Sequence, residues 1–231
     1  SGKNYLLDII SLASTKDIYI DSFNTDYDPI IMTIRREAEE NGVPIIRKEA
    51  GEFIKLLMLM NKPENILEIG AAVGFSAIFM SRFLEDDAHI TTIENYQPRI
   101  EEAKKNIERA GAQDVITLLE GDALEILPGL SDEYDMVFMD AAKGQYGSFF
   151  KDAIRLLREG GILLCDNVLQ DGDVVQSRYA VERRDRTIHA RMREYLYTLK
   201  HMEELETSII PIGDGAAISV KIEIEKERVG K

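Results

Sequence analysis

Short apolar runs alternate with helical segments along most of this chain, and this alternation restricts its fold more than any other feature. The predicted strands are ILEIG (66–70), HITTIE (89–94), VITLL (115–119), DMVFMD (135–140) and GILLC (161–165). Helices are predicted between them at 75–84, 98–110 and 146–158. Strands that alternate with helices favour a doubly wound, Rossmann-like α/β sheet with parallel neighbouring strands.

The two ends of the chain depart from this alternation. Amphipathic helices are predicted at 28–41, before Gly42, and at 47–60, before Pro63. After a helix at 186–201, the run LETSIIPIGDGAAISVKI predicts a closing hairpin across 213–215. We therefore predict one domain over residues 1–231, with a helical N-terminal extension (1–62) and a core (63–231) that carries the active site.

Composition fits a compact enzyme. The chain has 231 residues, is 45% hydrophobic, and has no apolar stretch of the roughly 18 to 20 residues that span a bilayer. Its start lacks a basic region followed by an apolar core, and Cys165 is its only cysteine, so we expect a cytoplasmic protein without membrane contact. A net charge of −14 argues against indiscriminate nucleic-acid binding by the whole surface.

Acidic residues follow two of the predicted strands. Asp140 follows MVFM, and Asp166 with Asn167 follows GILLC. If the strands are parallel neighbours, these side chains lie together at the carboxyl edge of the sheet, where such sheets bind ligands. Two carboxylates and an amide oxygen are hard ligands suited to Mg²⁺. The alternative is that each aspartate only caps the next helix.

A glycine-bearing turn follows the first predicted strand in EIGAAVGFS (68–76). Gly70 and Gly74 allow close backbone access to a nucleotide-like ligand, and the helix that starts near Ser76 offers backbone N–H groups. The G-x-G-x-x-G fingerprint of dinucleotide sites is absent, which disfavours a nicotinamide oxidoreductase. Glu94, at the end of the second strand, is placed to accept hydrogen bonds from ribose hydroxyls.

Two further acidic residues belong to the same edge. Glu68 lies inside an otherwise apolar strand, so its carboxylate requires compensation, for example by a ligand ammonium group. Asp122, followed by Ala123 in the LEGDA turn, either lines an adenine pocket or caps the following helix.

Taken together, EIGAAVGFSA, TIE, GDA, MDAAKGQY and CDNV resemble the cation-dependent class I S-adenosylmethionine O-methyltransferases of the catechol and caffeoyl-CoA type, from about Val43 to Lys221. The resemblance implies a seven-stranded sheet with helices on both faces and a final antiparallel strand. It implies that Mg²⁺ or Mn²⁺ is held by Asp140, Asp166 and Asn167. It also implies a methyl-donor site made by Glu68, Gly70, Gly74, Ser76, Glu94, Asp122, Ala123 and Asp140.

The resemblance further implies that Lys143 is the general base. A lysine has a reference pKa of about 10.4, so this role requires burial and a neighbouring cation to lower the pKa. The alternative is a surface lysine that begins a loop. Because every implied metal and base position is filled, a binding protein without catalytic activity is disfavoured.

An arginine-rich segment, 178–193, follows the predicted metal ligands. Its arginines are Arg178, Arg183, Arg184, Arg186, Arg191 and Arg193, against only two acidic residues. Arginine forks suit phosphate, so we expect Arg183, Arg184 and Arg186 to contact RNA. A solvated helix face or a subunit contact is the alternative.

The whole chain is similar to a bacterial branch of this family that methylates 5-hydroxyuridine at the tRNA wobble position. The expected partner is then a tRNA anticodon loop, whose exposed bases proteins read readily. The second interpretation is an enzyme for small catechols or other vicinal hydroxyaromatic compounds. Apolar residues of the N-terminal helices could serve a homodimer, which we expect, as well as a core.

Overall fold

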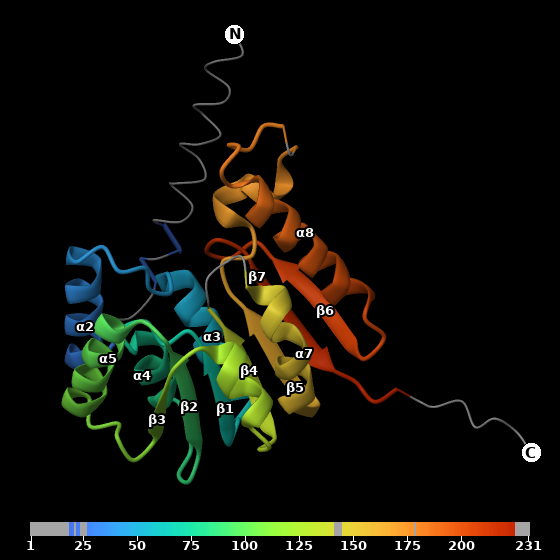
Figure 1. Cartoon of the computed structure of the whole chain (residues 1–231). Coiled ribbons are helices and arrows are strands. Elements are labelled where there is room, and N and C mark those ends of the chain that lie inside the picture. Colours follow the sequence, from blue (N-terminus) through green and yellow to red (C-terminus); the bar gives the residue numbers. More distant parts are fainter. Residues whose placement is uncertain (1–18, 21, 24–26, 141–144, 178, 225–231) are drawn as a thin grey trace, which may run out of the picture.

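The computed structural model describes residues 19–20, 22–23, 27–140, 145–177 and 179–224 (Figure 1). Its strands are β1 (Asn65–Ile69), β2 (His89–Glu94), β3 (Ile116–Glu120), β4 (Tyr134–Met139), β5 (Leu157–Cys165), β6 (Leu205–Ile210) and β7 (Ala216–Lys221). Its α-helices are α2 (Pro29–Glu40), α3 (Lys48–Asn61), α4 (Phe75–Ser81), α5 (Gln97–Arg109), α6 (Ala123–Ile126), α7 (Tyr146–Leu156) and α8 (Arg186–His201). Two 3-10 helices are η1 (Leu127–Gly129) and η2 (Gln170–Val175).

The strands form one sheet in the order β3-β2-β1-β4-β5-β7-β6. Strands β1 to β5 pair in parallel, and β7 lies antiparallel to both β5 and β6. The predicted α/β sheet with an antiparallel C-terminal strand is therefore confirmed. The order reverses at β1 and β4, and a ligand site is expected outside the carboxyl ends of strands at such a reversal.

Helices cover both faces of the sheet (Figure 1). Alternate residues of each central strand face opposite ways, so Ile66 joins a core with α2 to α5, while Leu67 joins a core with α7 and α8. Buried residues of α2 and α3 belong to the first of these cores. The N-terminal helices are therefore packed on the sheet through the same apolar layer as α4 and α5.

The chain chemistry explains where several helices begin and end. Helix α2 begins after Asp28, whose side chain accepts hydrogen bonds from the N–H groups of Ile30 and Ile31, and Pro29 occupies the first turn. The chain leaves this helix through Gly42, at a φ of 64°. Within the described part of the chain, none of the helices has both the length and the apolar character needed to cross a membrane.

Some predicted boundaries were wrong. Helix α4 ends at Ser81, before residue 84, and α7 ends at Leu156 because β5 already begins at Leu157. The register between β4 and β5 shifts after Tyr134, which lengthens β5 beyond the apolar run GILLC. The short helices α6, η1 and η2 were not predicted, since one or two turns carry no amphipathic period.

Candidate active site

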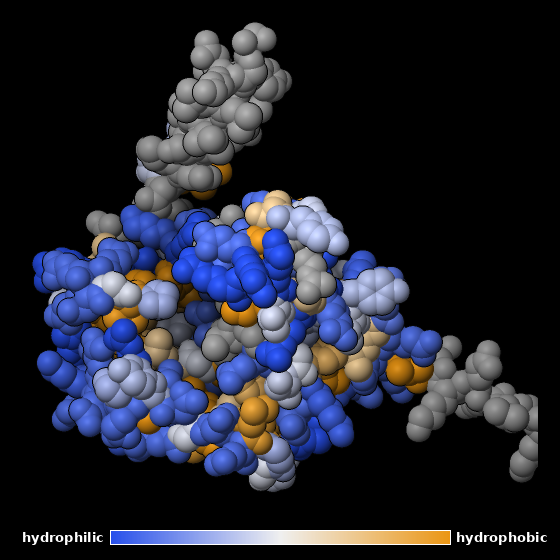
Figure 2. All heavy atoms as spheres, turned by 45° about the horizontal axis from the view of Figure 1, so that its top comes forward, coloured by the Kyte–Doolittle hydropathy of each residue, from blue (hydrophilic) through white to orange (hydrophobic). Residues whose placement is uncertain are grey.

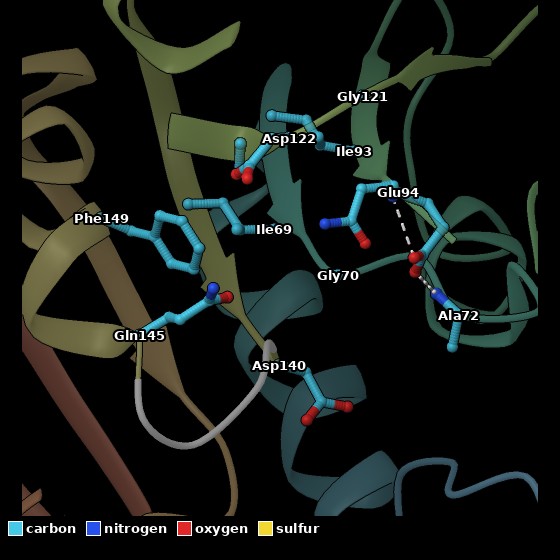
Figure 3. A pocket seen from close by; sticks show the side chains of 12 residues that line it. Ile69, Gly70, Ala72, Ile93, Glu94, Gly121, Asp122, Asp140, Gln145 and Phe149 are labelled. Carbon is cyan, nitrogen blue, oxygen red and sulfur yellow. Dashed lines mark hydrogen bonds between the residues drawn. The ribbon is translucent and has the colours of Figure 1, made fainter. Parts of the chain in front are cut away.

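A cavity of about 190 Å³ opens at the carboxyl ends of β1, β2, β3 and β4 (Figure 3). It is lined by Ile69, Gly70, Ala72, Ile93, Glu94, Asn95, Gly121, Asp122, Ala123, Asp140, Gln145 and Phe149. Gln145 and Phe149 approach the cavity from the α7 side, across from Gly70 (Figure 3). Five of the predicted site residues thus share one cavity: Gly70, Glu94, Asp122, Ala123 and Asp140.

The turn after β1 has a backbone that only certain residues adopt readily. Gly70 and Gly74 have φ angles of 104° and 78°. A Cβ on Gly74 would lie 3.4 Å from the Cα of Ala103 in α5, so a hydrogen at this position also lets two helices approach closely. Gly74 therefore packs against α5, whereas Gly70 lines the cavity itself.

Glu94 is fixed at the end of β2 by three backbone donors. The N–H groups of Ala72, Asn95 and Tyr96 donate to its two carboxylate oxygens, each at 2.9 Å. The hydrogen bond with Ala72 links the end of β2 to the turn after β1 (Figure 3). An ionised carboxylate offers about four acceptor positions, so Glu94 retains capacity for a ligand hydroxyl on the cavity side.

Glu68 is fully buried in β1. Thr92 Oγ1 donates to its Oε2, while its Oε1 has no hydrogen-bond partner among the described residues. The pKa of Glu68 is raised to about 7, mainly by burial and to a smaller extent by the charges of Asp140 and Glu94, whereas Ser76 and Thr92 lower it. The predicted need of this carboxylate for a compensating group is therefore met only in part by the protein.

Asp122 caps a helix and also lines the cavity. Its Oδ1 accepts a hydrogen bond from Leu124 N at 2.9 Å, which caps α6. The same residue lines the cavity, together with Ala123. The cap orients the carboxylate at the cavity wall, so the two alternatives are compatible.

Asp140, Asp166 and Asn167 are brought together by the pairing of β4 with β5. Asn167 Nδ2 donates to Asp140 Oδ1 at 3.0 Å, and Asn167 N donates to Asp166 Oδ1 at 2.8 Å. Asn167 adopts a left-handed backbone, with a φ of 58°, which asparagine tolerates better than most residues. Burial and, next, repulsion from Asp140 together raise the pKa of Asp166 to about 7, while the N–H of Asn167 and the charge of Arg47 act in the opposite direction.

This donor set fits a hard divalent cation. The carboxylates of Asp140 and Asp166 repel one another, which a divalent cation between them would relieve, and the amide of Asn167 presents its oxygen after a half turn. No group of three His, Cys, Asp or Glu side chains with metal-binding geometry occurs in the described ranges, so an amide oxygen would have to complete the protein ligands. Lys143, the predicted base, lies outside the described residues.

A second, smaller cavity adjoins the first. It is lined by Pro44, Ile45, Ile46, Gly70, Ala71, Ala72, Phe75, Ser76 and Asp140. Ser76 and Asp140, both predicted site residues, thus line the same cavity. Residues 44–46 were not predicted from the sequence as part of the site, because Pro-Ile-Ile between two helices has no polar or charged side chain that indicates binding. Asn95, Gln145 and Phe149 were also missed, although Gln145 belongs to the quoted MDAAKGQY motif.

The predicted RNA-binding arginines do not line either cavity. Arg183 and Arg184 are exposed, and Arg184 lies 3.0 Å from Glu182 and 3.4 Å from Asp185. Arg186, the first residue of α8, donates to Val181 O. Arg193 connects α8 to η2 by donating to Val174 O at 2.9 Å, so the segment is tied to the chain that leaves Asn167.

Comparison with known proteins agrees with this geometry. A family model described as O-methyltransferase matches residues 22–222. A catechol O-methyltransferase from Niastella koreensis is 35% identical over 165 residues, which cover 69% of this chain and 75% of that protein.

Solved structures match over most of the chain. A Staphylococcus aureus protein, provisionally described as a caffeoyl-CoA O-methyltransferase, is 34% identical with a TM-score of 0.82 over 91% of this chain and 99% of that one. The O-methyltransferase TomG from Streptomyces achromogenes, crystallised with S-adenosylmethionine, is 26% identical with a TM-score of 0.79 over 90% of this chain and 96% of that one. The chain therefore belongs to the family of S-adenosylmethionine-dependent O-methyltransferases of the catechol and caffeoyl-CoA type.

Proposed function

We propose that the protein methylates a hydroxyl that stands next to a second chelating oxygen, with Mg²⁺ or Mn²⁺ held by Asp140, Asp166 and Asn167. The observation that carries this proposal is the meeting of these three side chains at the ends of β4 and β5, beside the cavity that contains Glu94. When bound, the cation would lower the pKa of the acceptor hydroxyl and fix its position.

The remaining chemistry is a displacement at carbon. The acceptor oxygen gives up its proton, forms a bond to the methyl carbon, and the carbon–sulfur bond of the sulfonium breaks to leave a neutral thioether. We propose Lys143 as the group that takes the proton, Glu94 as the ribose ligand, and Glu68 as the partner of the donor's ammonium group. Holding the reactants in register can contribute roughly 7 to 11 kcal/mol to lowering the barrier.

The acceptor that we propose first is 5-hydroxyuridine at the tRNA wobble position. Its 5-hydroxyl and 4-carbonyl oxygens would chelate a divalent cation as a catechol does. The exposed side chains of Arg183 and Arg184 support this choice, because they offer guanidinium groups to RNA phosphates. A tRNA acceptor would also place the reaction in the cytoplasm.

Small catechols are the second candidate acceptors. The 35% identity with a catechol O-methyltransferase supports them, and so does the absence of the three arginines from the walls of both cavities. The two candidates share the same donor and metal residues and differ only in what lies outside the cavity.

A methyl-transfer assay with both acceptors tests the proposal. tRNA that carries 5-hydroxyuridine should be methylated, and the matched tRNA with unmodified uridine should not, because it lacks the nucleophilic hydroxyl. A kcat/KM for catechol that exceeds the value for this tRNA would favour the second candidate. Failure of both acceptors would reject a vicinal-dioxygen substrate.

The metal is tested by Asp166→Asn and by chelation. The variant should lose turnover and Mg²⁺ binding in calorimetry, while its affinity for S-adenosylmethionine stays within about threefold, because Asp166 is not among the residues that line the larger cavity. Full activity of the wild type in excess chelator would remove the metal from the proposal.

We also infer a homodimer. Leu56, Leu59 and Met60 lie on one side of α3 with exposed fractions of 53%, 54% and 70%, and such apolar groups favour burial against a second copy. Light scattering should give twice the chain mass for the wild type and a single mass for Leu59→Asp with Met60→Asp. Ile222→Asp, also at an exposed apolar position, is the control and should remain dimeric.

A further inference from the structure

Arg35 in α2 is an arginine in a place where arginines are rarely found. It is only 6% exposed, although its neighbour Arg36 is exposed, and α2 contributes no residue to either cavity of the active site. Burying a guanidinium costs free energy unless nearby groups replace its water. The contacts of Arg35 therefore indicate what this side chain does.

These contacts join three separate parts of the chain. Arg35 Nη2 donates to the carbonyl oxygen of Ile46 at 3.1 Å, and the guanidinium carbon lies 4.7 Å from the ring centre of Phe75, at the start of α4. Glu39 supplies only a long contact of 3.5 Å to Nη1 from a side chain that is 59% exposed. The short contacts of Arg35 are thus made to Ile46 and Phe75 and not to an acidic residue.

Both of these partners belong to the active site. Ile46 and Phe75 line the smaller cavity, together with Gly70, Ser76 and Asp140. Residues 43–47 lie outside the helices and strands, and backbone hydrogen bonds hold the two ends of this segment, from Val43 N to Ala38 O and from Gly51 N to Arg47 O. The hydrogen bond from Arg35 is a direct tie between this irregular segment and the layer of helices that carries the glycine turn.

We propose that Arg35 is a positioning residue for methyl transfer. It holds the segment Pro44–Ile46 against α4 and thereby sets the space between the glycine turn and Asp140. Arg35 itself touches neither reactant. Loss of the tie would let the segment move and the acceptor bind out of line, whereas the donor contacts of Glu94 would remain.

The experiment compares Arg35→Met, Arg35→Lys and the control Arg36→Met. Arg36 is the adjacent residue of the same helix, and its side chain is 68% exposed with a contact to Glu40 at 4.0 Å. Amide hydrogen exchange in residues 43–48 should become faster in Arg35→Met and stay at the wild-type rate in Arg36→Met. This readout needs no acceptor, so it remains decisive even if catechol is not a substrate.

With catechol as the probe, kcat/KM per S-adenosylmethionine-binding site should fall by about 10 to 100-fold in Arg35→Met, because small misplacements of reacting groups have effects of this size. The donor affinity should change less than threefold. Arg35→Lys keeps the charge above Phe75 and one donor, so it should recover part of the loss. Normalisation to donor-binding sites removes any effect of misfolded protein.

Two results would overturn the proposal. One is wild-type hydrogen exchange at 43–48 in Arg35→Met. The other is faster exchange with unchanged kcat and KM per binding site, which would make Arg35 a stabilising residue only. If Arg35→Met fails to fold, hydrogen exchange and kinetics are measured on Arg35→Lys instead. Wild-type hydrogen exchange together with wild-type kcat and KM in Arg35→Lys would likewise reject the role.

Discussion

At the scale of single residues, Glu68 has the chemistry that depends most on its surroundings. Burial raises its pKa to about 7 in the folded protein, above the value of about 4.3 expected in the unfolded chain. Between these values the folded state binds more protons than the unfolded state. The contribution of this group to the free energy of unfolding is therefore full below about pH 4 and is lost as the pH rises through 7.

Glu68→Gln removes this dependence. Without donor or metal, the free energy of unfolding of the variant relative to the wild type should increase from pH 5 to pH 8 by up to about 3 kcal/mol. Urea denaturation at both pH values measures it. If the variant and the wild type differ in free energy of unfolding by the same amount at pH 5 and at pH 8, Glu68 does not titrate in this range. In calorimetry, the variant should also bind S-adenosylmethionine more weakly, if its carboxylate pairs with the ammonium group.

Glu94→Ala should weaken S-adenosylmethionine binding by about 1.5 to 3 kcal/mol, the range for hydrogen bonds to a charged group. The effect has two parts, because the variant loses the proposed ribose acceptor and also releases the N–H of Ala72 in the turn after β1. Glu120→Ala is the matched control, since Glu120 pairs with Glu94 in the sheet but does not line the cavity. Unchanged affinity in calorimetry would place the ribose elsewhere.

The sequence allowed the prediction of five residues that line the larger cavity but not of their hydrogen-bond partners. Glu68 and Glu94 stand out because carboxylates within or directly after apolar runs are unusual. The cap made by Asp122 and its place at the cavity wall could not be separated by spacing alone. Arg35 gave no signal, because an arginine in an amphipathic helix normally faces solvent, and only the packing of α2 on α4 buries it.

At the scale of elements, the junction of β1 and α4 depends on Gly74. Gly74→Ala should destabilise the protein by about 1 to 2 kcal/mol from its left-handed backbone alone, and by more because the new Cβ meets Ala103. Gly111→Ala is the matched control: Gly111 has a φ of 63° and no atom within 4 Å of the added Cβ. Urea denaturation should show a larger loss for Gly74→Ala, and equal losses would mean that the contact with α5 is not tight.

Strands were easier to predict than the segments between them. The run HITTIE predicted β2 to the residue, since four of its six residues are β-branched and favour strands. Strand register and tertiary contacts determine where α4 and α7 end and how long β5 is, and the local sequence does not encode them. The segment 44–46 enters the active site only because α2 and α3 pack on the same side of the sheet as α4.

At the scale of the whole molecule, the negative net charge of the protein disfavours binding of the proposed RNA substrate. The net charge is −14, so long-range attraction to a polyanion must come from a local group of basic residues. Figure 2 shows a mostly hydrophilic face that is hollowed near its middle, and Figure 1 places the chain that leads into α8 above the sheet. The arginines at 183, 184 and 186 lie in this stretch, at one end of α8.

Replacing Arg183, Arg184 and Arg186 with alanine tests whether this segment meets RNA. The KM for tRNA carrying 5-hydroxyuridine should rise, and each lost phosphate contact should reduce the slope of log affinity against log salt by roughly 0.7. Removing the exposed charges of Arg36, Lys62 and Lys105 changes the net charge equally and should leave that slope almost unchanged. Turnover of catechol should be the same in all three proteins, because none of these side chains lines either cavity of the active site. Unchanged tRNA kinetics together with impaired catechol turnover would reverse the choice of acceptor, since the arginines would then shape a small-molecule site.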